Sequence, residues 1–238
     1  MPQSIIHLLQ LHQVPIFRQL QIEEALLRCD NRNWCILNEG STPAIVMGIS
    51  AKEAQWVNLP LLQKKPLPLI RRFSGGGTVV VDESTLFATL IGEVEDSGVS
   101  CSPDHVHSLA LQIYQDLFVD DRFSLRENDY VFGEKKFGGN AQYLRKGRWL
   151  HHTSFLWQFD PQKMEYLTLP PKMPSYRKKR PHHEFLCTLD QWLPSREMFR
   201  KKMIDVLKKR YHVREVGLEE IEPFLSIPHR KATKLISV

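Results

Sequence analysis

The chain has 238 residues, of which 42% are hydrophobic and 25% charged, and its formal net charge is +5. This length allows a buried core without disulfide or metal support, and the composition excludes extensive disorder. The modest positive charge fits an anionic ligand or an acidic protein as well as nucleic acid, so charge alone does not select a partner.

The cysteine pattern and the N-terminal residues bear on the compartment. The four cysteines lie far apart, and no two have the Cys-x-x-Cys spacing typical of zinc or redox sites, so we interpret them as reduced thiols. Residues 1–17 show no secretory signal or Arg-rich transit pattern, and no stretch approaches the roughly 20 apolar residues of a membrane span. These features predict a cytoplasmic protein that does not enter the membrane, with an organelle matrix as the open alternative.

The first quarter of the chain predicts a strand, a helix and two further strands. Residues 5–11 are expected to form a strand, and Pro15 then stands where a helix can begin, followed by apolar residues near helical spacing. Residues 34–37 and 44–47 are β-prone runs. The turn-rich cluster 39–43 between them favours a hairpin-like connection.

Three more predicted strands surround a run of glycines. Residues 68–72 and 78–81 flank the glycines, and residues 86–91 supply the next β-prone run. We expect adjacent strands joined by tight loops. The glycines therefore lie between strands rather than at the start of a helix.

The rest of the chain predicts helices on either side of a second group of strands. Residues 104–119 have the apolar spacing of an amphipathic helix, and residues 129–157 are expected to form short strands separated by glycines. Residues 195–211 are predicted to close the chain as a helix that Ser195 caps. Without repeats or low-complexity linkers, the sequence predicts one α/β domain over residues 1–238.

The first chemical signal is the segment RRFSGGGT at residues 71–78. Consecutive glycines let the backbone approach a ligand and direct several N–H groups into one concavity, which suits a phosphate or a carboxylate. The preceding arginines add permanent charge. A flexible turn is the alternative, and neither a Walker-type nor a dinucleotide-binding glycine pattern is present.

The second signal is the segment KKFGGNAQ at residues 135–142, followed by the pair His151 and His152. A lysine beside a glycine bend can place a positive charge against a phosphate or a developing oxyanion. On a strand the two histidines point to opposite faces, so at most one can face a given pocket.

We interpret the basic run 177–180 as a solvated loop, with docking of a partner or contact with phosphate as the alternative.

Together these segments resemble the lipoate-protein ligase A branch of the biotin/lipoate protein ligase family over roughly residues 5–156. The matching motifs are Arg-Arg-x-Ser-Gly-Gly-Gly with a following aspartate, here Asp82, the lysine segment with the preceding Asn128, and the histidine pair. The resemblance implies an α/β (α+β) fold like that of class II aminoacyl-tRNA synthetases and biotin ligases. In it, helices flank a mixed, largely antiparallel sheet.

The resemblance also implies the chemistry. Lipoate or octanoate would react with ATP to give the acyl-adenylate, with Mg²⁺ screening the triphosphate, and a carrier lysine would then take the acyl group. By this likeness Lys136 is the catalytic residue, and Arg72 binds a phosphate or closes over the ligand. No metal ligand is assigned. The further acyl- or adenylate-binding positions it implies are Ser74, Gly75, Gly76, Gly77, Thr78, Val79, Val80, Asn128, Gly138, Gly139, Asn140, Ala141 and His152.

The implied partners are lipoyl domains of 2-oxoacid dehydrogenase complexes or the glycine cleavage H protein. We expect the protein to lack the separate C-terminal accessory domain of the longer ligases, so that it either works alone or needs a second polypeptide as a further partner. Val81 and Thr85 depart from the family's histidine and asparagine at these places. The alternatives are an ATP-independent octanoyl or lipoyl transferase and a non-catalytic acyl- or carrier-binding module. Binding to nucleic acid is not expected, because no aromatic-plus-basic signature accompanies the charge.

Overall fold

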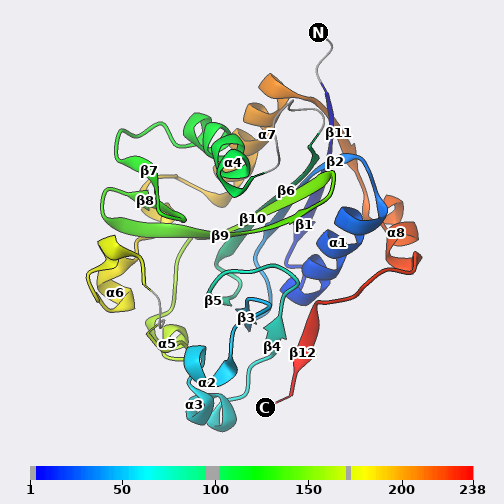
Figure 1. The fold of residues 1–238 in the computed structure, drawn as a ribbon. Helices are drawn as coiled ribbons and strands as arrows, with labels where there is room; N and C mark the ends of the chain where they lie inside the picture. Colours follow the sequence, from blue (N-terminus) through cyan, green and yellow to red (C-terminus); the bar gives the residue numbers. More distant parts are fainter. Residues whose placement is uncertain (1–3, 95–101, 170–172, 238) are drawn as a thin grey trace.

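The computed structural model describes residues 4–94, 102–169 and 173–237, and two β-sheets organise its fold (Figure 1). The larger sheet has eight strands in the order β11-β1-β2-β6-β10-β9-β8-β7. Strand β1 is parallel to β2 and β11, whereas all other neighbours are antiparallel, which confirms the predicted mixed, largely antiparallel sheet. Its strands are β1 (Ile5–His12), β2 (Asn33–Glu39), β6 (Thr85–Glu93), β7 (Phe123–Arg126), β8 (Asp129–Phe132), β9 (Lys135–Arg145), β10 (Arg148–Leu156) and β11 (His212–Val216).

The smaller sheet has four strands in the order β12-β4-β3-β5. They are β3 (Ala44–Met47), β4 (Leu69–Arg71), β5 (Thr78–Val81) and β12 (Lys234–Ile236). The expected hairpin of residues 34–37 and 44–47 is wrong, because β2 and β3 belong to different sheets. The expectation of adjacent strands around the glycines is also wrong, because β3 lies between β4 and β5 and β6 belongs to the larger sheet. Turn residues show where a chain reverses, but they do not determine which strands pair.

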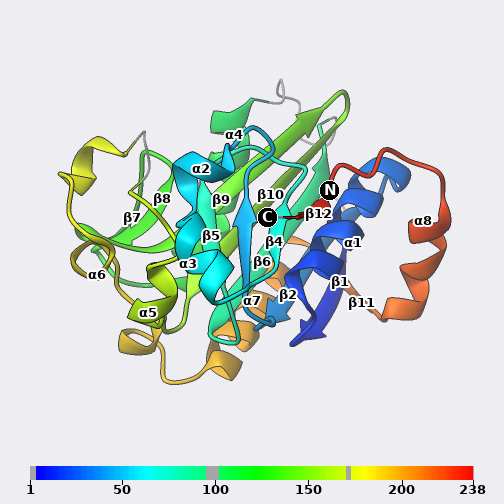
Figure 2. The same cartoon turned by 90° about the horizontal axis from the view of Figure 1, so that it is seen from below.

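The long helices cover the two faces of the larger sheet (Figures 1 and 2). Helices α4 (Pro103–Leu117) and α7 (Arg196–Arg210) pack together on one face, and α1 (Ile16–Cys29) packs on the other beside α8 (Glu222–Ser226). The Ser195 hydroxyl accepts from the backbone N–H of Met198, so the predicted cap of α7 is confirmed. This helix does not close the chain, because β11 and β12 follow it. None of the described helices is long and apolar enough to cross a membrane.

Short helices border the smaller sheet and the far end of the larger one. Leu62 and Tyr166 pack with Ile45 in an apolar cluster on the outer side of the smaller sheet. The short helices are α2 (Glu53–Trp56), α3 (Leu59–Lys64), α5 (Pro161–Met164) and α6 (His182–Phe185), with the 3-10 turns η2 (Ser175–Arg177), η3 (Leu189–Gln191) and η4 (Leu218–Glu220). Local apolar patterns in pieces this short are weak, which explains why the sequence did not predict them.

Apolar side chains are buried on both faces of the larger sheet. On one face Tyr114 of α4 and Phe199 of α7 pack with Phe155 of β10. On the other, Leu20 of α1 shares a cluster with Val46 of the smaller sheet. Because the smaller sheet belongs to this second cluster, the glycine loop that leaves β4 is held against β9 and β10.

Candidate active site

A cavity of about 670 Å³ opens where the glycine loop of the smaller sheet meets β9 and β10 of the larger one. Arg72 and Lys136 line the same cavity, although they lie 64 positions apart in the sequence. Every residue predicted for the site lines it except Ser74, which is buried beneath the glycine loop. The residues that line it are Arg72, Gly75, Gly76, Gly77, Thr78, Val79, Val80, Asn128, Lys136, Gly138, Gly139, Asn140, Ala141 and His152.

The buried guanidinium of Arg72 holds the glycine loop in shape. Its Nε donates to Ser74 Oγ at 3.0 Å and to the Gly75 carbonyl at 3.1 Å, and its Nη2 donates to the same carbonyl at 2.5 Å. Gly76 has a φ of +94°, and a Cβ there would come within 2.7 Å of Arg72 Nη2. Burial lowers the pKa of Arg72 to about 10, while Glu23 opposes the shift, so the side chain stays charged at neutral pH. Contact of Arg72 with phosphate stays a prediction.

A buried chain of hydrogen bonds continues from the glycine loop to helix α1. Ser74 Oγ lies 2.9 Å from His152 Nε2, and His152 Nδ1 lies 2.9 Å from Glu23 Oε2. The other Glu23 oxygen accepts from Gln19 Nε2 at 2.8 Å and from Thr89 Oγ1 at 2.7 Å. Because an ionised carboxylate only accepts, His152 donates from Nδ1, and its Nε2 can accept the Ser74 proton when the ring is neutral. This network joins α1, β6, β10 and the loop.

Lys136 of β9 is oriented by a carboxylate. Its Nζ lies 2.6 Å from Asp129 Oδ1, and the Tyr176 hydroxyl donates to Asp129 Oδ2 at 2.8 Å. The neighbouring Phe137 points into the core, as strand alternation requires. Burial raises the pKa of the Tyr176 hydroxyl, and the negative charge of Asp129 raises it further, so this hydroxyl remains a donor. The lysine ammonium therefore stands in the cavity with one carboxylate beside it.

The two glycines after Lys136 have different roles. A Cβ on Gly138 would lie 2.7 Å from the Phe155 ring, so this position must be small for the core to close. A Cβ on Gly139 would lie 3.1 Å from Lys136 Nζ. The first glycine serves packing, and the second leaves room for the lysine ammonium and whatever it binds.

Asn140 connects the second glycine segment to helix α4. Its Oδ1 lies 2.9 Å from His107 Nε2, and its Nδ2 donates to the Asn128 carbonyl at 2.9 Å. The three residues line one stretch of the cavity wall. Asn128 contributes its backbone to this network, and a ligand contact from its side chain stays a prediction.

The histidine pair divides between the two faces of β10, as its position on a strand predicts. His152 lines the cavity, whereas the fully buried His151 faces the other side. There its Nε2 lies 3.0 Å from the Tyr130 hydroxyl and its Nδ1 lies 3.3 Å from Gln142 Nε2. Burial lowers the pKa of His151 well below its usual value, so this ring is neutral.

Several cavity residues were missed by the sequence analysis. Glu23 lines the cavity from α1, and Trp56 of α2 stands beside Gly77. Tyr176 and Arg177 are buried, so the interpretation of residues 177–180 as a solvated loop is wrong for Arg177. No local pattern distinguishes a basic run with one member turned inward from a basic run on the surface.

The described cysteines offer no nucleophile to this cavity. Cys35 and Cys187 are buried, and neither they nor the half-buried Cys29 line the cavity. Burial raises the pKa of the Cys187 thiol to about 11, so this thiol is protonated at neutral pH. Cys101 lies outside the described residues.

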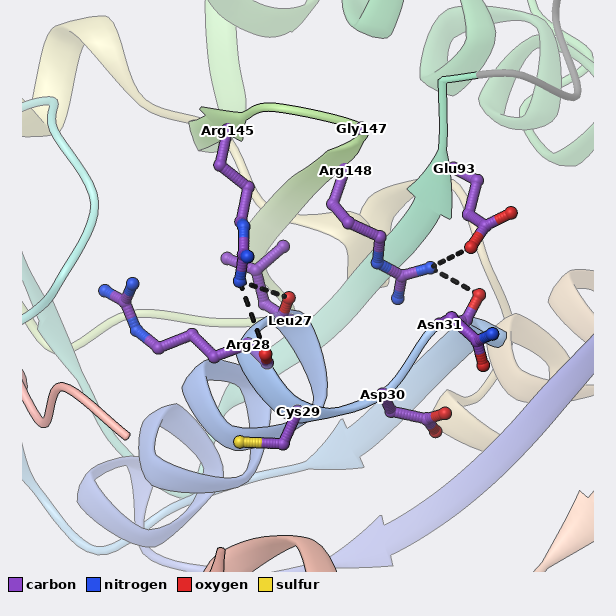
Figure 3. A pocket seen from close by; sticks show the side chains of 9 residues that line it. All are labelled: Leu27, Arg28, Cys29, Asp30, Asn31, Glu93, Arg145, Gly147 and Arg148. Atoms are coloured by element: carbon purple, nitrogen blue, oxygen red, sulfur yellow. Dashed lines mark hydrogen bonds and ion pairs between the residues drawn. The ribbon is translucent and has the colours of Figure 1, made fainter. Parts of the chain in front are cut away.

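A second hollow, of about 440 Å³, lies at the turn between β9 and β10 (Figure 3). Arg145 donates to the carbonyls of Leu27 and Arg28 in the last turn of α1, each at 3.3 Å. Arg148 donates to the Asn31 carbonyl at 2.7 Å and lies 3.7 Å from Glu93. Cations at a helix C-terminus satisfy its free carbonyls and oppose its dipole. Arg145 therefore stabilises the end of α1, and Arg148 holds the segment that follows the helix.

Comparison with known proteins points to one family. A family model described as "Lipoyl protein ligase A/B catalytic domain" matches residues 15–212. The chain is 26% identical over 246 aligned residues to "Inactive lipoate--protein ligase 2" of Plasmodium falciparum, with 78% of this chain and 64% of that protein covered. It is 27% identical over 179 residues to "Probable lipoate-protein ligase A" of Mycoplasma pneumoniae, with 74% and 52% covered. The chain thus spans roughly half to two-thirds of the length of these relatives.

Solved structures show the same fold at low sequence identity. A lipoate-protein ligase A bound with ATP superposes with a TM-score of 0.74 at 18% identity, covering 94% of this chain and 93% of that one. A bi-partite lipoate protein ligase from Thermoplasma acidophilum gives a TM-score of 0.69 at 21% identity, covering 94% and 91%. Because the family model covers most of the sequence, the chain belongs to the lipoyl protein ligase A/B catalytic domain family.

Proposed function

We propose that this protein is a lipoate-protein ligase, which activates lipoate or octanoate with ATP and transfers the acyl group to a lysine of a lipoyl-carrier domain. The observation that carries the proposal is one cavity with an apolar wall and a cationic end. Ile16, Leu20 and Phe87 contribute apolar surface, and Lys136 supplies the cation. Each methylene buried against such surface contributes about 0.8 kcal/mol to binding, while the ammonium suits a carboxylate and phosphates.

In the first half-reaction, a carboxylate oxygen of the acyl substrate attacks the α-phosphorus of ATP. A new O–P bond forms, the bond to the β-phosphate oxygen breaks, and pyrophosphate leaves with the electron pair. Lys136 would exchange part of its contact with Asp129 for the oxygens that gain charge, and backbone N–H groups of Gly75, Gly76 and Gly77 would face the ligand. The fixed Arg72 contacts keep this loop in place before substrate arrives.

In the second half-reaction, the neutral amine of the carrier lysine attacks the acyl carbonyl carbon. The C–N bond forms, the C–O bond to the phosphate breaks, AMP leaves with that electron pair, and the nitrogen releases one proton to solvent. Lys136 would stabilise the oxyanion of the tetrahedral intermediate. Removing a single preorganised donor of this kind slows a reaction by on the order of 10²- to 10³-fold.

Mg²⁺ is the metal that an ATP-dependent first step requires, and Asp129 is the residue that would hold it. Magnesium is bound through one or two carboxylates together with substrate phosphates, and it neutralises triphosphate charge. Asp129 lines the cavity, and Lys136 must release one of its oxygens for the ion to bind. Among the described residues no group of three or more His, Cys, Asp or Glu side chains could hold a metal, which fits an ion brought in by the nucleotide.

The carrier is proposed to be a lipoyl domain of a 2-oxoacid dehydrogenase complex or the glycine cleavage H protein. The similar Thermoplasma protein is described as a bi-partite ligase together with its E2 lipoyl domain. By analogy, a separate accessory polypeptide is a candidate partner for the adenylation step. The Lys136 side chain is about a quarter exposed, so an incoming lysine can reach it from solvent.

A non-catalytic acyl-binding module is the second candidate, and two observations favour it. One relative is named an inactive ligase. Val81 and Thr85 also line the cavity at the places where the family pattern has a histidine and an asparagine, and Thr85 Oγ1 already accepts from the backbone N–H of Asp82 at 3.1 Å. The intact Lys136–Asp129 pair supports the enzyme instead.

One assay separates these functions. The protein is incubated with ATP, Mg²⁺, lipoate or octanoate and an unmodified lipoyl domain, and the mass of the carrier is followed. We expect a mass increase that requires ATP and is lost in Lys136→Ala. A mass increase with an acylated carrier donor and no ATP would identify a transferase. Lipoate binding without pyrophosphate release, with or without an accessory polypeptide, would identify a non-catalytic module.

A further inference from the structure

Arg177 is a buried cation with an unused hydrogen-bond donor. The residue is 4% exposed, lies over the Phe185 ring with Cζ 4.8 Å from its centroid, and lines the cavity. Its Nε donates to the Arg180 carbonyl at 2.9 Å, but its Nη2 is buried without a partner among the described residues. No carboxylate in the described part of the chain forms an ion pair with it. A buried guanidinium with an unpaired N–H destabilises the folded protein unless a ligand accepts a hydrogen bond from that N–H.

The backbone after Arg177 is held in an unfavourable conformation. Lys178 and Lys179 have φ values of 51° and 59°, in the left-handed region that residues with a Cβ rarely adopt. Arg177 and Arg180 close this turn by donating from Nε to each other's carbonyl, at 2.9 and 3.1 Å. Strain of this kind persists where the surroundings enforce it and is concentrated at functional sites. The turn fixes the direction of the Arg177 side chain.

The position of Arg177 indicates which part of a ligand it meets. Tyr176, its neighbour, donates to Asp129, which pairs with Lys136, so Arg177 lies at the reactive end of the cavity. Asp129 already offsets the Lys136 charge. His182 also lines the cavity, but burial, then Arg177 and Lys136, lower its pKa to about 4, so it is neutral at neutral pH. Asp129 also acts on Arg177 through its charge, but no carboxylate in the described part of the chain forms an ion pair with this guanidinium.

We propose that Arg177 binds the pyrophosphate part of the nucleotide. This inference rests on the proposed function, in which the oxygen bridging the α- and β-phosphates leaves with its electron pair. The free Nη2 donor would take an oxygen of the β- or γ-phosphate, and the guanidinium would offset the charge that the leaving pyrophosphate gains. A guanidinium suits phosphate because it is permanently charged and its donors form a fork. The α-phosphate and acyl carboxylate remain with Lys136.

The test compares Arg177→Gln with Lys179→Gln, a variant that loses the same charge from an exposed side chain two residues away. Inorganic pyrophosphate, ATP and lipoate are titrated separately by calorimetry. We expect pyrophosphate and ATP to bind about 10- to 100-fold more weakly to Arg177→Gln, the range for a charge-assisted hydrogen bond. The lipoate affinity should not change, and Lys179→Gln should bind all three ligands like the unmodified protein. Arg177→Lys should recover part of the loss.

A second measurement uses synthetic lipoyl-adenylate, which lacks the β- and γ-phosphates. Arg177→Gln should transfer its acyl group to the carrier at a rate within about twofold of the unmodified protein, since no contact to Arg177 is lost. The inference is overturned if pyrophosphate binds equally to the unmodified protein and to Arg177→Gln, if Lys179→Gln weakens it as much, or if lipoate binding falls in parallel. Binding needs no turnover, so a protein that binds pyrophosphate but never acylates the carrier refutes the proposed function alone.

Discussion

Replacing Glu23 by alanine should destabilise the protein strongly, because three buried donors meet at this carboxylate. Gln19, Thr89 and His152 donate to it at distances of 2.8, 2.7 and 2.9 Å, and the side chain is completely buried. Alanine would leave all three donors without an acceptor. It would also remove the negative charge that favours the charged form of the buried Arg72.

The magnitude follows from these contacts. Removing one partner from a buried charged network costs about 3–5 kcal/mol, a large share of the roughly 5–15 kcal/mol that stabilises a domain. At about 2–4 °C per kcal/mol for a chain of this size, the melting temperature should fall by about 6–20 °C. Glu23→Gln keeps the volume and one acceptor oxygen, so we expect a cost of about 1–2 kcal/mol.

Urea and thermal unfolding of Glu23→Ala, Glu23→Gln and Glu134→Ala measure these costs. Glu134 is an exposed acid whose nearest cations lie 3.8 and 3.9 Å away, so its loss should cost no more than about 1 kcal/mol. If Glu23→Ala unfolds within about 1 kcal/mol of Glu134→Ala, the network does not carry the stability assigned to it. Equal losses in Glu23→Ala and Glu23→Gln would show that the charge, rather than the acceptor, is decisive.

The remaining predictions concern the glycines of β9 and one histidine. Gly138→Ala should lower the free energy of unfolding in urea by about 1–3 kcal/mol, because its methyl group would lie 2.7 Å from the Phe155 ring. Gly139→Ala, whose methyl would lie 3.1 Å from Lys136 Nζ, should instead slow carrier acylation by about 10- to 100-fold with little loss of stability, and wild-type turnover would contradict this role. Burial lowers the pKa of the His182 imidazole from 6.5 to about 4. As the pH drops from 6.5 towards 4, the unfolded protein therefore binds a proton at this histidine before the folded protein does. The free energy of unfolding should fall by about 1–2 kcal/mol over this range, allowing for solvent screening. His182→Gln should flatten this part of the stability curve, and an unchanged slope would refute the assignment.

Much of the site was predictable because many of the residues that line the cavity belong to two short sequence segments. The glycine run before Thr78 and the segment around Lys136 each place small residues beside a cation, which only a close ligand or tight packing requires. The pair at His151 and His152 was predicted to divide between two faces because strand alternation is a local property. The caps and apolar spacing of the long helices are local in the same sense.

The remaining features depend on contacts between residues distant in sequence. Apolar patterning and the glycine segments determined the helices, the β-prone runs, the buried faces and the two segments that line the cavity. Only the tertiary structure decided that β2 and β3 enter different sheets, that Glu23 meets His152 across 129 positions, and that Arg177 turns inward while Lys178 stays in solvent. The physical reason is that strand partners and the burial of a charge are chosen by the free energy of the whole packed chain, whereas a sequence segment encodes only its own conformational preferences.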